Sequence, residues 1–190
     1  ACGNLVTVTA ALPGTQSGLT ATKAFSPNTV APGGNSQLTV TLTAPAATCM
    51  PAPTTPVYTG LAFTDTLPAG MTVAATPGAS TTCAGASISA TGGAGQFSLA
   101  DASLAPGASC TATVTVSVTG AGTFNNRISA TLGQPGAITN TQGVAALADA
   151  VATLTTTAAV VPTLGSYAVA ALALLLGTLG IRRIRPPSRS

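Results

Sequence analysis

The sequence predicts an all-β protein, an antiparallel β-sandwich followed by a single C-terminal transmembrane helix. Short segments in which apolar side chains alternate with Thr and Ser are separated by turns that contain Gly and Pro. No helical periodicity competes with this pattern before residue 158. Residues 158–181 then form an uncharged, apolar segment, which is followed at once by Arg182 and Arg183.

The expected strands follow one another from residue 19 to residue 157. The clearest example, residues 37–43, places Leu38, Val40 and Leu42 on one face and three threonines on the other. A strand-like run, residues 5–9, also precedes this region, and the Pro-rich residues 44–56 predict a long loop. The expected strands are 19–25, 37–43, 59–65, 71–75, 86–90, 96–99, 110–119, 123–130 and 150–157. Seven or more short strands at this spacing are typical of a sandwich in which each sheet has one solvated face.

Composition excludes several classes of protein. Hydrophobic residues make up 46% of the 190-residue chain, which is enough for a core, whereas charged residues make up only 5%, so the chain does not resemble a disordered one. The formal charge of +3 comes from four arginines in residues 182–189, and the rest of the chain has two basic and three acidic side chains. Without a basic face, nucleic-acid binding is not expected.

The C-terminal segment has the features of a membrane anchor. A bilayer span needs about 20 apolar residues, and a helix that begins near Pro162 supplies that length. The basic residues after it, Arg182, Arg183 and Arg185, are expected to stop the segment in the membrane and to remain cytoplasmic. A buried core helix is the alternative interpretation of this segment.

Two sets of motifs resemble known bacterial families. The phrases KAFSP (23–27), VAPG (30–33), FTDTLPAGM (63–71), LAPG (104–107) and FNN (124–126) resemble the surface repeats first catalogued as domain of unknown function eleven. This resemblance implies an Ig-like sandwich in a secreted or cell-wall protein, with the segment 44–59 as an insertion.

The second resemblance lies at the C-terminus. Before the apolar run and its arginines, the chain is similar to the IPTL-type C-terminal sorting signal of Gram-negative bacteria, which implies export and membrane insertion, with a sorting or processing enzyme as a partner. Departures from that signal are the first residue of the motif, usually Ile, and Tyr167, where Trp is frequent. The motif residues are Val161, Pro162, Thr163, Leu164 and Tyr167.

Together these features divide the chain into four parts. Residues 1–18 form an N-terminal segment with one strand, residues 19–157 the Ig-like β-sandwich, residues 158–185 the sorting motif and transmembrane helix, and residues 186–190 a basic cytoplasmic tail. The chain begins with Ala rather than Met and has no signal peptide, so we expect it to be a processed or truncated form.

Four cysteines indicate an oxidising compartment. Cys83 and Cys110 flank two short strands and are expected to form a disulfide, which leaves Cys2 and Cys49 as a second pair, although three pairings are formally possible. The chain has no His and no CxxC motif, so neither a zinc site nor any cofactor is expected.

The residue inventory argues against an enzyme. Nucleophilic catalysis lacks a His base, and glycoside chemistry would have to use the three scattered aspartates, because the chain has no Glu. The sequence therefore favours a non-catalytic structural or adhesive module that is anchored at the surface, with neighbouring repeats or further copies of itself as partners besides the membrane. The alternative is an accessory subunit of a membrane complex that docks through its C-terminal helix, where glycines allow close approach.

Strand alternation places three polar residues in the expected core. Lys23, Asp65 and Asn126 each share the apolar face of their own strand. One interpretation is a buried Lys23–Asp65 ion pair to which Asn126 is hydrogen-bonded, because a buried charge must be paired or neutralised. The other is an autocatalytic isopeptide bond between Lys23 and Asn126, with Asp65 as proton carrier, similar to the crosslinks of Gram-positive pilin and adhesin domains.

Overall fold

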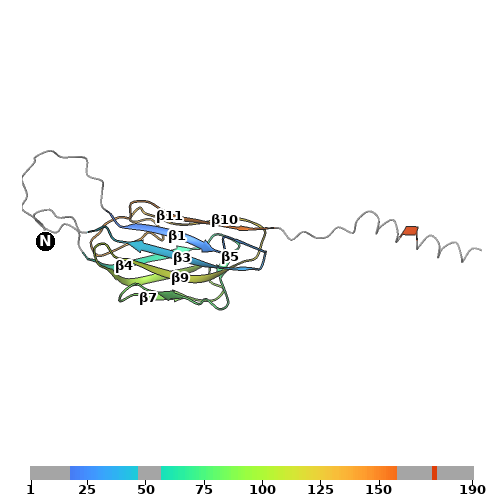
Figure 1. The fold of residues 1–190 in the computed structure, drawn as a ribbon, viewed down its shortest axis with the longest axis horizontal. Helices are drawn as coiled ribbons and strands as arrows, with labels where there is room; N and C mark the ends of the chain where they lie inside the picture. The colour runs from blue at the N-terminus through green and yellow to red at the C-terminus, as the bar shows by residue number, and fades with distance from the viewer. Residues whose placement is uncertain (1–17, 47–56, 158–172, 175–190) are drawn as a thin grey trace, which may run out of the picture. The chain divides into compact units, whose positions relative to one another are not determined.

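The protein is described here by a computed structural model, which covers residues 18–46, 57–157 and 173–174 (Figure 1). By compactness the chain divides into two units, Ala1–Ala158 and Ala159–Ser190, and the β-domain lies in the first. Its described residues form eleven strands. These are β1 (Thr20–Ser26), β2 (Thr29–Val30), β3 (Asn35–Thr43), β4 (Tyr58–Thr66), β5 (Met71–Val73), β6 (Ser80–Thr81), β7 (Ser87–Ala90), β8 (Gln96–Leu104), β9 (Ser109–Val118), β10 (Gly122–Ile128) and β11 (Ala150–Thr156).

Three sheets make up the domain. The largest has the order β1-β3-β9-β5, with β6 also paired to β9, and the two smaller sheets have the orders β10-β11-β2 and β4-β8-β7. In Figure 1, β10 and β11 lie on one side of β1 and β3, and β7 lies on the opposite side of the domain. The fold is therefore all-β and sandwich-like, as the sequence pattern predicts.

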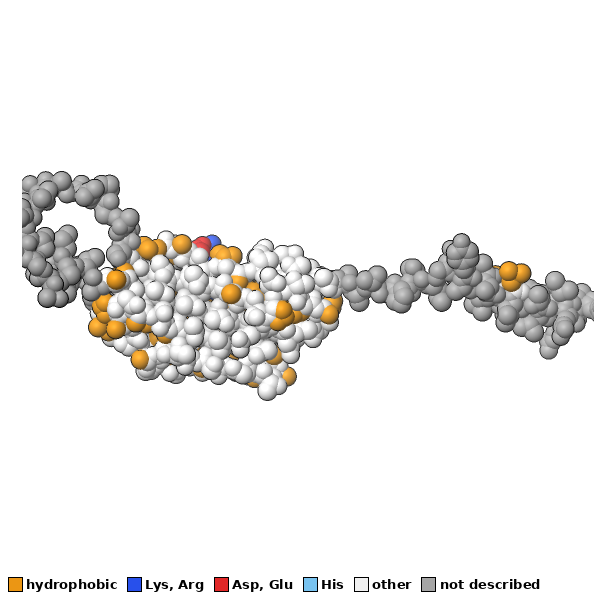
Figure 2. Space-filling model, in the orientation of Figure 1, with side chains coloured by type: hydrophobic (Ala, Val, Ile, Leu, Met, Phe, Trp, Pro, Cys, Tyr) orange, Lys and Arg blue, Asp and Glu red, His pale blue; other side chains and the backbone are white. Residues whose placement is uncertain are grey.

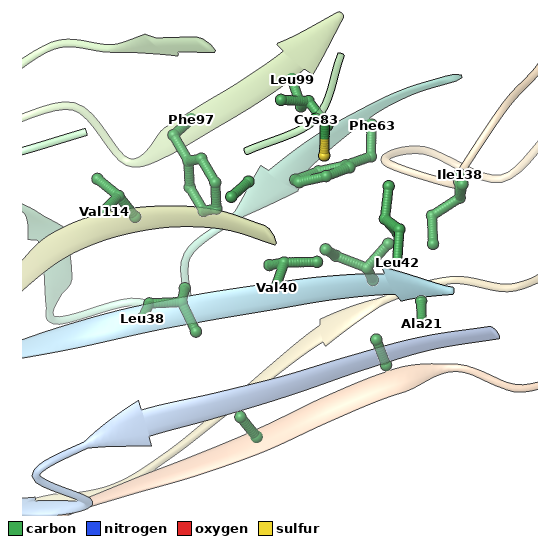
Figure 3. Packing of buried hydrophobic residues seen from close by; sticks show 14 of the residues in the cluster. Ala21, Leu38, Val40, Leu42, Phe63, Cys83, Phe97, Leu99, Val114 and Ile138 are labelled. Carbon is green, nitrogen blue, oxygen red and sulfur yellow. The ribbon is translucent and has the colours of Figure 1, made fainter. Parts of the chain in front are cut away.

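The core follows directly from the alternation in the sequence. In β3 and β9 every second side chain is buried, and the residues between them, mainly Thr and Ser, face outward. Figure 3 shows Leu38, Val40 and Leu42 of β3 and Phe97 of β8 among the packed core side chains, and all of them belong to one hydrophobic cluster. Phe63 and Phe97 meet edge to face, with ring centroids 5.8 Å apart.

The expectation of a purely antiparallel sandwich is wrong at the second strand. After β1 the chain passes Pro27 and leaves the large sheet, and β2 then pairs in parallel with β11. Backbone hydrogen bonds join Thr155 N to Asn28 O at 3.0 Å and Thr157 N to Val30 O at 3.2 Å. The N-terminal part of the domain thus contributes one strand to the large sheet and another to the sheet that contains the last strand.

The open edge of β4 is covered by the segment that follows β10, where the sequence pattern predicts no strand. Ala62 and Thr139 exchange two backbone hydrogen bonds, and Thr141 N donates to Thr59 O at 2.9 Å. Gly136 lies so close to β4 that a Cβ atom would come within 2.5 Å of the Thr64 carbonyl oxygen. Because Gly136 also has φ +74°, only glycine suits this position.

The predicted C-terminal transmembrane helix is not supported, and this part of the fold class is corrected. Only Ala173 and Leu174 are helical in the part of the chain that the structure describes, and no helix there is long and apolar enough to cross a membrane. Apart from these two residues, segment 158–190 lies outside the described residues, and so do the run 5–9 and most of the loop 44–56.

The surface of the β-domain is unusually poor in charge. Figure 2 shows a face on which blue and red side chains are nearly absent. Of the charged side chains in the described β-domain, Lys23 and Asp65 are buried, Asp101 is exposed, and Arg127 and Asp149 form an exposed pair at 3.0 Å. Hydroxyl groups of Thr and Ser therefore provide most of the polar surface of the strands.

Candidate functional site: a buried Lys-Asp-Asn cluster

Lys23, Asp65 and Asn126 come from three strands that belong to three different sheets. Lys23 lies in β1 opposite Val40, Asp65 in β4 opposite Phe97, and Asn126 in β10 opposite Ala152. The burial pattern of each strand alternates strictly here, so that each polar side chain occupies a position that would otherwise be apolar. The side chains of Lys23 and Asp65 are both 0% exposed.

All three residues meet at one oxygen atom. Lys23 Nζ donates a hydrogen bond to Asp65 Oδ2 at 2.7 Å, and Asn126 Nδ2 donates to the same oxygen at 3.0 Å. The structure thus brings together the three residues that alternation places in the core. Their convergence is compatible with both interpretations of the sequence, the ion pair and the crosslink.

The hydrogen bonding of the cluster is incomplete. Asp65 Oδ1 and Asn126 Oδ1 are both buried, and neither has a hydrogen-bond partner. Leaving a buried acceptor unpaired costs about 1–3 kcal/mol, and more when the acceptor is charged. An ionised Asp65 would therefore carry an unsatisfied charged oxygen in the core.

Burial disfavours both charges of the pair. It lowers the pKa of Lys23, while the attraction to Asp65 and their hydrogen bond act in the opposite direction. Burial likewise raises the pKa of Asp65, and the charge of Lys23 and the hydrogen bonds from Lys23 and Asn126 oppose this. The larger effect on each group is desolvation, so the neutral amine and the neutral carboxylic acid are both favoured relative to water.

Replacement of Lys23 by Met is expected to make stability depend on pH. The variant loses the two effects of Lys23 that lower the pKa of Asp65, so the pKa in the folded state rises further above its unfolded value of about 4. A carboxyl with a raised folded pKa contributes its stability fully below that unfolded value, and the contribution is lost as pH rises through the folded pKa. The melting temperature should therefore fall more between pH 4 and pH 8 in Lys23→Met than in Asn126→Ala, which keeps the Lys23–Asp65 pair and cannot form the Lys23–Asn126 crosslink.

The double variant Lys23→Met, Asp65→Leu is the matched control for this measurement. It lacks the buried carboxyl and should lose the extra pH dependence. If both variants had the same pH profile, Asp65 would not be the group responsible.

The disulfide predicted between Cys83 and Cys110 is present, with the Cα atoms 4.9 Å apart. Cys83 follows β6, which pairs with β9, and the next residue, Ala84, forms a bridge to Ser103 of β8. The bond therefore fastens the point where the chain passes from the large sheet to the sheet of β7 and β8. The second expected pair, Cys2 and Cys49, lies outside the described residues.

The remaining acidic residues are not part of the cluster. Asp149 accepts a hydrogen bond from Ala130 N at 2.8 Å and pairs with Arg127, so it stabilises the end of a strand. Asp101 is exposed in β8, with φ 60°, beside an irregularity in the pairing with β4. No group of three or more potential metal ligands occurs among residues 18–46 and 57–157. A shallow depression of about 410 Å³ between β4, β8 and residues 134–139 is lined without any titratable side chain.

Sequence reasoning missed the covering segment that supports β4 next to Asp65. Its signal is weak, because Ile138 is its one large, fully buried apolar residue and the segment lacks alternation. The predicted sorting-motif residues, Val161, Pro162, Thr163, Leu164 and Tyr167, lie outside the described residues, as do the arginines from Arg182 onward.

Comparison with known proteins gives two matches to family models. Residues 20–156 match the family described as Domain of unknown function (DUF7933), and residues 159–186 match the IPTL-CTERM motif. The motif match supports a C-terminal sorting signal, whereas the predicted relation to the Ig-like repeats of domain of unknown function eleven is not shown. No match to a curated protein was found.

Several solved chains match this protein, and one of them is described here. It is described as the crystal structure of BslA, a bacterial hydrophobin, and the alignment has 10% sequence identity and a TM-score of 0.43. The alignment covers 75% of this chain and 95% of the other.

Proposed function

Since the chain belongs to the DUF7933 family over residues 20–156 and has a sorting motif after it, we propose that it is a non-catalytic structural module displayed at the surface of the cell envelope. The observation that carries this proposal is the IPTL-CTERM match at residues 159–186, which indicates an envelope or surface location. The Cys83–Cys110 disulfide agrees with export to an oxidising compartment.

The described β-domain supports a structural rather than a catalytic role. The chain lacks His and Glu, and the buried Lys-Asp-Asn cluster is closed to any substrate, because each of its residues is at most 8% exposed. This cluster can therefore affect the stability of the β-domain but cannot bind a substrate. The outward residues of β3 and β9 are mainly Thr and Ser, which suit a surface that is exposed to solvent.

Labelling of intact cells tests the location. An epitope inserted at Gly93, in the turn before β8, has open space around it and should be detected on unbroken cells of a bacterium that has the sorting pathway. The variant Pro162→Ala, Thr163→Ala changes only the motif and should abolish most of the surface signal, with similar total protein by immunoblot. Detection only after cell lysis would contradict surface display.

A further inference from the structure

We propose that Lys23 and Asn126 become joined by an isopeptide bond, which the folded domain forms by itself with Asp65 as the acid–base group. The bond would connect β1, the first strand of the described domain, to β10, in a different sheet. This inference does not depend on where the protein is displayed, so it stands or falls separately from the proposed function.

The geometry supplies the reacting groups. Lys23 Nζ and Asn126 Nδ2 both contact Asp65 Oδ2, so the two nitrogen atoms are separated by no more than the sum of two hydrogen bonds. Three strands hold the groups in place, and the side chains of Lys23, Asp65 and Asn126 are all buried. Fixing a nucleophile beside its target in this manner replaces an encounter in solution by an intramolecular step.

The environment sets the protonation states that the reaction needs. An ammonium group is not a nucleophile, whereas the neutral amine is. Transfer of one proton from Lys23 Nζ to Asp65 gives a neutral amine and a carboxylic acid, and the buried site favours both of these uncharged forms. No other charged side chain of the described residues hydrogen-bonds to the cluster and opposes this transfer.

The reaction balances without any further reactant. The lone pair of Lys23 Nζ attacks Cγ of Asn126, and the proton on Asp65 stabilises the amide oxygen as negative charge develops on it. Asp65 then accepts a proton from Nζ and delivers one to Nδ2, the Cγ–Nδ2 bond breaks, and ammonia leaves. The new Nζ–Cγ amide remains, and Asp65 ends as the carboxylic acid that it was after the first transfer.

The unpaired oxygens favour the crosslink over a permanent ion pair. In the ion pair, Asp65 Oδ1 and Asn126 Oδ1 are two buried acceptors, and neither accepts a hydrogen bond. A protonated Asp65 adds the missing O–H donor, and a half-turn of the Asn126 amide would present its oxygen to that donor. The acid and the new amide then satisfy each other through one O–H···O and one N–H···O bond.

Digestion with trypsin tests the bond directly, because Lys23 is the chain's only lysine and the next cleavage site is Arg127. The full chain is denatured, reduced, alkylated and digested, and the peptides are weighed. A crosslinked protein should give residues 1–127 as one species that is lighter by one ammonia, since acylated Lys23 is not cleaved. Quantitative release of residues 24–127 would overturn the proposal, and loss of a water instead of ammonia would assign the bond to Asp65.

Two asparagines that are neighbours in β10 provide matched variants. Asn126→Ala should restore cleavage after Lys23, whereas Asn125→Ala should leave the crosslink intact, because Asn125 points outward and only accepts a hydrogen bond from Thr153. Resistance at Lys23 in Asn126→Ala would overturn the assignment of the acceptor. Asp65→Asn should slow crosslinking about a hundredfold or more, as expected for loss of a general acid–base group. Formation at the unchanged rate would overturn the role of Asp65, and the digest of the unmodified chain decides the bond itself even if this variant does not fold.

Discussion

Replacement of Asp65 by Ala is expected to lower the free energy of unfolding by about 3–5 kcal/mol, the usual cost of breaking a buried ion pair by removing one partner. Asp65 Oδ2 is the shared acceptor for Lys23 and Asn126, so its loss leaves a buried amine and a buried amide without their hydrogen-bond acceptor. Urea unfolding monitored by circular dichroism measures the change. If the chain forms the Lys23–Asn126 bond, its loss adds to this effect.

Two controls separate burial of charge from loss of packing. Lys23→Met, Asp65→Leu fills the site with apolar groups and should recover most of the stability that Asp65→Ala loses. Neither variant can form the crosslink, and only Asp65→Ala leaves the Lys23 amine buried without a partner. Arg127→Ala breaks the exposed pair with Asp149 and should cost less than about 1 kcal/mol. If Asp65→Ala and Arg127→Ala lowered the free energy of unfolding equally, the buried Lys23–Asp65 pair would contribute no more to stability than the exposed Arg127–Asp149 pair.

Removal of the Cys83–Cys110 disulfide by the double variant Cys83→Ala, Cys110→Ala is expected to cost about 3–4 kcal/mol. The two cysteines are 27 residues apart. In the chain-entropy model, closing a loop of that length lowers the entropy of the unfolded chain, and this stabilises the folded state by the stated free energy. At about 2–4 °C per kcal/mol, the melting temperature should fall by about 10 °C.

The reduced form of the unmodified protein is the natural comparison. In dithiothreitol the unmodified protein should approach the melting temperature of the double variant, while the variant itself should not respond. A response of the variant to reduction would show that another disulfide contributes to the effect.

The strands were predictable because one face of each is buried. In β9, alternation of Ala and Val with Thr and Ser runs unbroken from residue 111 to residue 118, and the structure buries every second residue. β8 was predicted only to residue 99, although it continues to Leu104. The alternation of buried and exposed residues in β8 is interrupted at Asp101, which has a positive φ and lies at a shift in the register with β4. Beyond Asp101 the alternation resumes one residue later.

Short strands and their partners were not predictable. β2 and β6 have two residues each, which is too short for any periodicity to appear. The parallel pairing of β2 with β11, and the segment that covers the edge of β4, depend on contacts between residues more than 70 positions apart. No local pattern encodes such contacts.

Much of the candidate cluster was predictable from parity alone. A Lys, an Asp and an Asn that each replace an apolar residue on an alternating strand must point inward, and inward-pointing polar groups seek one another. Convergence on a single carboxylate oxygen, and the two acceptors left unpaired, depend on how the three sheets are placed and appear only in the structure.

The parallel alignment of β2 with β11 has a mechanical consequence. In a domain without the Lys23–Asn126 bond, tension that reaches β2 from its N-terminal side and β11 from its C-terminal side pulls two parallel strands from opposite ends, so that they slide along one another. The hydrogen bonds from Thr155 to Asn28 and from Thr157 to Val30 lie across that direction, so they bear the load together instead of opening one after another. Such a shear arrangement resists extension better than an unzipping hairpin, and it occurs where the last strand leaves the β-domain.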